Sequence, residues 1–159
     1  MSQDEILRQQ LAKAMDWNEA HADLRAAVEA FPAKLCGRIP EGFPHSAWQL
    51  LEHIRLALWD ILEFSRDARH KSPKWPEGYW PKSPKPSSDD AWEKSVKAVE
   101  EHLREMRKLV IDPSRDLFAP LPYGAGQTLL RQALLVADHN AYHLGQLVLL
   151  RRALGAWQG

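Results

Sequence analysis

Cysteine, net charge and long apolar runs are all scarce in this sequence, and each shortage excludes a class of protein. Cys36 is the only cysteine, so no disulfide can form within the chain, and no secretory-type N-terminal segment is visible; both favour a cytoplasmic protein. Basic and acidic residues number 21 each, which leaves no excess charge to attract nucleic acid. No run of about 18 uncharged apolar residues occurs, so no membrane-spanning helix is expected.

Alternating β-type patterns are absent too, and helical periodicity fills most of the chain. Ser46 and Gln49 have the spacing of a capping box, and Pro32 and Pro113 follow two other periodic segments. The sequence predicts helices over about residues 3–15, 22–31, 46–66, 87–111 and 127–154. Because helices of about 20 residues reach about 30 Å, we expect a single all-α domain, residues 1–159, built as a four-helix bundle.

The last predicted helix carries two histidines in an otherwise apolar stretch. His139 and His143 are four residues apart, so their side chains lie on one face about 40° apart, a turn above each other, as a metal chelate requires. On the helix predicted over 46–66, His53 lies about a quarter turn from the centre of the apolar stripe, where it can line a cleft between helices. If the two helices run parallel, the three imidazoles reach similar heights.

Together the three histidines predict a metal site with a free coordination position. Three neutral imidazoles leave the fourth position of a zinc-like ion open, as in catalytic sites. Asn140 stands where a zinc metalloprotease needs glutamate, and the chain has no Glu-x-x-His motif of a di-iron centre, so neither class is supported. Imidazole suits zinc, nickel, copper and iron, so the residues do not fix the metal. Three unrelated structural histidines with no bound ion are the alternative.

Other polar residues are weaker candidates for this site. His21 and His45 lie where predicted helices begin and could act as further ligands. Asp60 and Gln146 share helix faces with the predicted ligands, so they could contact those ligands or transfer protons, with ordinary polar lining as the alternative. Cys36 has no second thiol nearby and is expected to be a small buried residue. No catalytic residue is assigned.

A connection of unusual composition, residues 71–88, joins the helices predicted over 46–66 and 87–111. It contains five prolines together with the aromatic residues Trp75, Tyr79 and Trp80. We expect a proline-stiffened crossover whose aromatic side chains pack on the end of the bundle, with a lid or a dimer arm as alternatives. His70, just before the connection, is expected to be solvated.

The last predicted helix is apolar on nearly every side, so two of its faces must be buried. Gly145 lies on the face opposite the histidines, where glycine costs about 1 kcal/mol of helix propensity relative to alanine. We therefore expect Gly145 to pack against another helix, within the bundle or across a dimer axis. Trp59, on the charged face of its helix, is a candidate for a subunit contact.

Two stretches of the chain resemble a known family. LLEHI at residues 50–54, followed far downstream by DHNAYHLGQ at 138–146, is similar to the DinB superfamily of metalloenzyme-like proteins. The resemblance implies a four-helix bundle, commonly a homodimer, that holds a divalent ion such as nickel or zinc with three histidines. Those ligand positions match His53, His139 and His143. Relatives include S-transferases and isomerases that use bacillithiol, mycothiol or glutathione, while many members have no assigned reaction.

The resemblance and the residues lead to two expectations about function. The first is a metal-dependent enzyme of the thiol S-transferase or hydrolase type, with a low-molecular-weight thiol as cosubstrate. The second is a non-catalytic, stress-associated homodimer in which the same three histidines bind a metal and stabilise the bundle. Neither involves nucleic acid or a membrane, and the small-molecule substrate is not identified.

Overall fold

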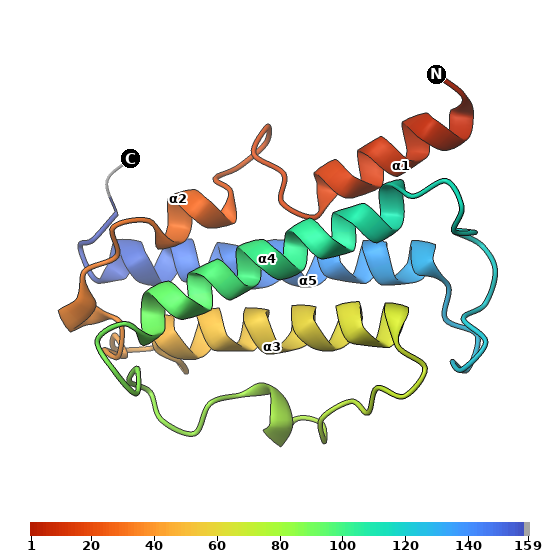
Figure 1. Ribbon diagram of the computed structural model, residues 1–159. Helices are drawn as coiled ribbons and strands as arrows, with labels where there is room; N and C mark the ends of the chain where they lie inside the picture. Colours follow the sequence, from red (N-terminus) through yellow and green to blue (C-terminus); the bar gives the residue numbers. More distant parts are fainter. Residues whose placement is uncertain (158–159) are drawn as a thin grey trace.

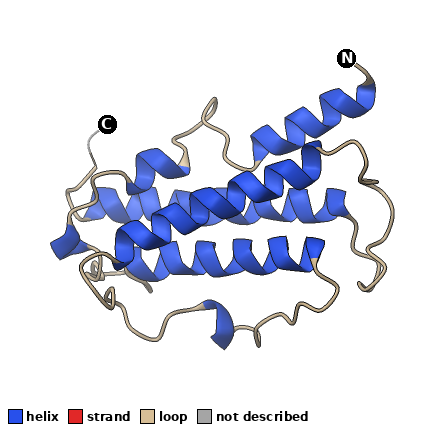
Figure 2. Cartoon of the chain, viewed as in Figure 1, coloured by secondary structure: helices blue, strands red, loops and turns tan. Residues whose placement is uncertain are grey.

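The computed structural model describes residues 1–157, and these contain helices and loops but no strand (Figure 2). The four long helices are α1 (Gln3–Ala14), α3 (Ala47–Arg66), α4 (Ala91–Ile111) and α5 (Leu129–Ala153), joined by the short α2 (Leu24–Val28) and the 3₁₀ turns η1 (Ala33–Leu35) and η2 (Glu77–Tyr79). The all-α prediction is confirmed, with every long helix close to its expected bounds.

Local signals set the helix ends. The capping box predicted at the start of α3 is present, because the Ser46 hydroxyl accepts from the Gln49 backbone and the Gln49 side chain accepts from the Ser46 backbone. Thr128 caps α5 with its hydroxyl alone, which accepts from the Arg131 backbone N–H. The helix predicted over 22–31 is shorter than expected, since Glu29 is extended and Ala30 has a φ of 49°.

The helix directions differ from one expectation (Figure 1). α3 and α4 run the same way, whereas α1 and α5 run the opposite way, so the two helices that carry the three histidines are antiparallel. The condition under which similar heights were expected, parallel helices, is therefore not met. The histidines still meet, because the first half of α3 lies against the middle of α5.

Two buried arginines tie the ends of the bundle together. Arg8 of α1 donates to three backbone carbonyls at and beyond the C-terminus of α4. Arg151 of α5 donates to the carbonyls of Ala26 and Ala27 at the end of α2. Both arginines donate hydrogen bonds to carbonyls that a helix end leaves without partners.

Between these ends lies one apolar core whose fully buried side chains include Leu51, Ile54, Leu58, Leu62, Met106, Leu147 and Leu150.

The 71–88 connection returns along the outside of the bundle from the end of α3 to the start of α4 (Figure 1). It is a crossover, as expected, but its aromatic side chains do not pack on the bundle end. Tyr79 and Trp80 pack on the flank of the bundle beside His53, while Trp75 is 68% exposed.

None of the described helices is long and apolar enough to cross a bilayer.

Two expectations about packing meet different outcomes. A Cβ placed on Gly145 would meet nothing within 4 Å, so the prediction of a neighbouring helix within the bundle is wrong, and a contact across a dimer axis stays a prediction. Trp59 lies edge-on to His70 at 5.1 Å between ring centroids, so part of its surface is used within the chain.

Candidate metal centre

Three histidines from two helices meet on the flank of the bundle. His53 comes from α3, and His139 and His143 come from successive turns of α5. One ring nitrogen from each lies within 4.8 Å of the others, and the Nε2 atoms of His53 and His139 are 3.1 Å apart. His53 is 2% exposed and His143 is 8% exposed. The antiparallel pair of helices thus brings together the three residues that the sequence singled out.

Hydrogen bonds orient two of the three rings. Nδ1–H of His53 donates to the Tyr79 carbonyl oxygen at 2.9 Å. Nδ1–H of His143 donates to the side-chain carbonyl oxygen of Gln146, also at 2.9 Å. In a neutral imidazole the second nitrogen then carries a lone pair, so Nε2 of both rings is available as a ligand.

Burial keeps all three rings neutral. It lowers the pKa of His53 to about 4, although the hydrogen bond to Tyr79 opposes this, and it lowers the pKa of His139 to about 3. The pKa of His143 is lowered as well, again by burial, against the opposing bond to Gln146. Charged imidazoles so close together would also repel one another. Neutral imidazole is the form that binds metal.

The donor set can be tested against the needs of a metal ion. Two nitrogens bound to a tetrahedral zinc ion, each about 2.0–2.1 Å from it, stand about 3.3 Å apart. The 3.1 Å separation of the His53 and His139 nitrogens is close to this value. Nδ1 of His139 is buried without a hydrogen-bond partner, and Nε2 is the atom of this ring that faces the other histidines. The residues therefore fit a divalent ion held by three imidazoles.

The weaker candidates lie in different places. Gln146 contacts a predicted ligand, His143, directly. His45 is not one of the clustered histidines. Its ring stacks on the Trp80 indole at 4.1 Å between centroids, and the His53 ring stacks on the same indole at 3.9 Å. His21 is exposed and contacts its own neighbouring backbone.

Asp60 is separated from the three histidines but connected to them through Tyr79. Its carboxylate accepts the Tyr79 hydroxyl at 2.6 Å and bonds His70 Nε2 at 2.7 Å. The His70 side chain is only 8% exposed, so the expectation of a solvated residue was wrong. No periodic pattern predicts that Tyr79 and Trp80 lie beside the histidines; their only signal is the presence of aromatic residues among prolines.

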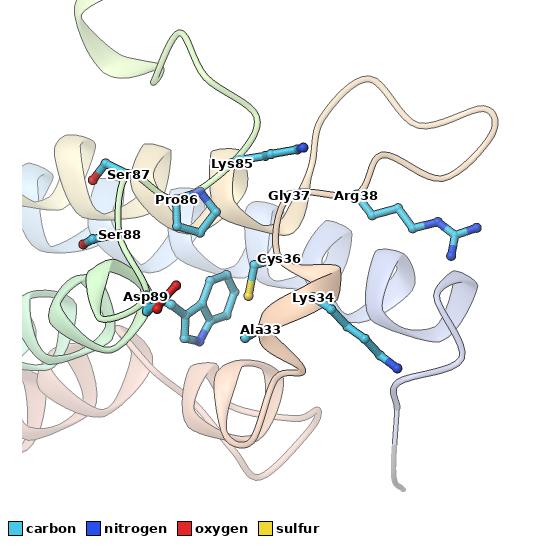
Figure 3. Close-up of a pocket in the computed structure, with 11 residues that line it drawn as sticks. Ala33, Lys34, Cys36, Gly37, Arg38, Lys85, Pro86, Ser87, Ser88 and Asp89 are labelled. Atoms are coloured by element: carbon cyan, nitrogen blue, oxygen red, sulfur yellow. The ribbon is translucent and has the colours of Figure 1, made fainter.

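Cys36 lines a hollow of about 620 Å³ between residues 33–38 and residues 85–89 (Figure 3). None of the three clustered histidines lines it. The thiol is buried, as expected, and burial raises its pKa to about 11. Cys36 is therefore protonated at neutral pH and is a poor nucleophile.

Comparison with known proteins gives one match. The family model described as the DinB superfamily matches residues 16–147, which is most of the chain and includes all three clustered histidines. Neither the curated proteins nor the solved structures contain a match to the chain. The sequence resemblance, the helical architecture and the position of the histidine cluster agree with this result, and the chain belongs to the DinB superfamily.

Proposed function

We propose that this protein is a metal-dependent enzyme of the thiol S-transferase or hydrolase type, with a divalent ion, nickel or zinc, held by His53, His139 and His143. The observation that carries the proposal is the convergence of three neutral imidazoles from two helices. Three protein ligands leave one position open on a four-coordinate ion, as catalytic rather than structural zinc sites do. An ion of this kind activates a bound water or stabilises a thiolate.

The residues around the cluster support this use. Tyr79 and Gln146 accept the Nδ1 protons of their histidines, so both rings are presented through Nε2. The Cys36 thiol has too high a pKa and is too deeply buried to act as the reacting thiol. We therefore propose a low-molecular-weight thiol as cosubstrate, in a cytoplasmic location where such thiols are kept reduced. A non-catalytic metal-binding protein, in which the same ion only stabilises the bundle, is the second candidate.

Metal binding is tested by calorimetric titration of the metal-free protein with zinc and with nickel. We expect one ion per chain for the wild type. His143→Ala removes a ligand and should weaken binding on the order of 100-fold or more, since even the loss of a supporting contact weakens metal sites 10–100-fold. His21→Ala, which removes an exposed histidine outside the cluster, is the matched control and should bind as the wild type does. Equal affinity in all three proteins would refute the site.

Catalysis is tested separately with the metal-loaded protein. Bacillithiol, mycothiol and glutathione are each offered with an electrophile, and turnover is compared between the wild type and His143→Ala. Turnover that the variant loses and His21→Ala retains supports the enzyme. Absence of turnover with every thiol, in a folded and metal-loaded sample, favours the non-catalytic alternative.

We also propose that the protein is a homodimer that uses the exposed face of α5. This face carries Leu134, Tyr142 and Leu149, which are 52%, 65% and 59% exposed, and the open space over Gly145 lies among them. Exposed large apolar side chains in a row on one helix indicate a protein contact. Tyr142 also lies edge-on to His143 at 4.8 Å between centroids, so such a contact would border the histidine cluster.

A further inference from the structure

His53 is held by a segment that lies outside the helical bundle. The Tyr79 carbonyl accepts its Nδ1 proton, and the Trp80 indole stacks on its ring with an angle of 5° between the planes. Both residues belong to the 71–88 connection. One of the three proposed ligands is therefore oriented by neighbouring residues of a proline-rich loop, and its geometry depends on how firmly that loop is held.

Tyr79 is fixed at both of its ends. Its backbone carbonyl binds His53, and its side-chain hydroxyl donates to Asp60, seven residues or about two turns further along α3. Tyr79 thus bridges two side chains on the same face of one helix. It is 7% exposed, which limits the space into which it could shift.

Asp60 is in turn held from its other side. Its second carboxylate oxygen bonds Nε2 of His70, whose ring lies edge-on to Trp59. The carboxylate therefore cannot rotate freely toward solvent, and it presents one fixed oxygen to the Tyr79 hydroxyl. Further along the connection, the buried Ser46 hydroxyl donates to the Pro84 carbonyl at 2.6 Å, so the segment is attached to α3 at a second point.

We propose that Asp60 is a positioning residue of the metal centre: through Tyr79 it holds the carbonyl that fixes His53 in the Nδ1–H tautomer with Nε2 turned to the cluster. For the metal this inference rests on the proposed function, whereas the tautomer of His53 can be measured without any metal. Contacts that orient a ligating histidine through its other ring nitrogen are known to change metal affinity 10–100-fold. Here the contact is the backbone carbonyl of Tyr79, and the Asp60 carboxylate positions that carbonyl indirectly, through the Tyr79 hydroxyl.

The test compares variants that change only this chain of contacts. Tyr79→Phe removes the hydroxyl and keeps the ring and the carbonyl. Asp60→Ala removes the acceptor, whereas Asp60→Asn keeps an oxygen that can accept the phenol proton. Glu77→Gln is the matched control, since Glu77 lies in the same connection and makes only an exposed contact with Lys74. Each protein is checked for its helical content and melting temperature before the measurements.

Two readouts decide the outcome: zinc affinity by competition with a chelating dye, and the His53 tautomer in metal-free protein by long-range ¹H–¹⁵N spectra. We expect Tyr79→Phe and Asp60→Ala to bind zinc about tenfold more weakly and to show a mixture of His53 tautomers. Asp60→Asn should recover most of the affinity, and Glu77→Gln should match the wild type.

The inference is overturned if Tyr79→Phe and Asp60→Ala lower only the melting temperature while the affinity and the tautomer stay as in the wild type. That result would make the carboxylate a plain attachment point for the loop. If the wild type binds no zinc, the tautomer still decides. A loss of the Nδ1–H form in the folded variants would then support positioning while the metal proposal fails, and an unchanged tautomer would end both.

Discussion

At the scale of single residues, burial decides the charge of the clustered histidines. In the folded protein the pKa values of His53 and His139 are lowered from 6.5 to about 4 and about 3. The unfolded chain therefore takes up protons below pH 6.5 that the folded chain does not bind, and stability falls as the pH drops through this range. Well above pH 6.5 both states are neutral at these positions, and the stability is fully present.

This predicts a pH dependence for the metal-free protein. Between pH 7.5 and pH 5, above the range in which most carboxylates titrate, the urea midpoint of the wild type should fall. His139→Gln removes the most strongly perturbed ring and should show a shallower fall over the same interval. Parallel pH profiles for the two proteins would contradict the argument. Chelator must be present throughout, because bound metal would compete with protons for the same nitrogens.

The sequence supplied the three histidines but not the residues that support them. Helical spacing and an apolar setting were enough to select His139 and His143, because a period of 3.6 residues places i and i+4 on one face. Tyr79 acts through its backbone carbonyl, which every residue has, so no side-chain pattern could reveal it. His70 was expected at the surface because nothing in its neighbourhood shows that Asp60 draws it inward.

At the scale of helices and connections, local chemistry was predictable and direction was not. The Ser46 capping box starts α3, Thr128 caps the start of α5 and Pro113 follows the end of α4, and these signals are readable because they act within a few residues. The 71–88 connection, however, can span up to about 60 Å when extended, which is more than the length of either helix that it joins. The length of the connection therefore permits α3 and α4 to run either parallel or antiparallel, and their packing decides between the two. The direction of α5 relative to α3 depends on that outcome.

The start of α3 offers a test at this scale. Ser46→Ala removes both the cap of α3 and the bond to Pro84, so we expect a loss of about 1–2 kcal/mol in the free energy of unfolding. Ser2→Ala is the matched control, because Ser2 forms the same capping box on α1 but is exposed and holds no loop. Chemical denaturation should show the larger effect at Ser46. A larger loss at Ser2 would mean that the connection adds nothing to the stability of α3.

At the scale of the whole molecule, the exposed face of α5 has a symmetry that suits a second copy of the chain. Asp138 and Arg152 are both exposed, and each lies seven residues from Gly145. In an antiparallel pair of α5 helices that cross at Gly145, Asp138 of one copy would face Arg152 of the other, twice. A two-fold axis requires this kind of self-complementary patch, and glycine at the crossing permits close approach of the backbones.

The proposed dimer makes a prediction about charge exchange. Asp138→Arg sets like charges against each other across the axis and should shift the protein toward monomer in sedimentation velocity experiments. Adding Arg152→Asp to that variant restores opposite charges and should restore the dimer. Recovery in the double variant is the informative result, because a surface change that merely disturbs α5 would not be repaired by a second one. A wild type that sediments as a monomer at high concentration would refute the dimer itself.

The distribution of the cluster along the chain has a consequence for biosynthesis. His53 and its partner His139 are 86 residues apart, and the Tyr79 carbonyl comes from between them. A nascent polypeptide therefore carries His53 long before the second and third imidazoles emerge from the ribosome, and a truncated product never assembles all three. Metal binding at this site would therefore be a late step of folding, open only to chains that contain all three histidines.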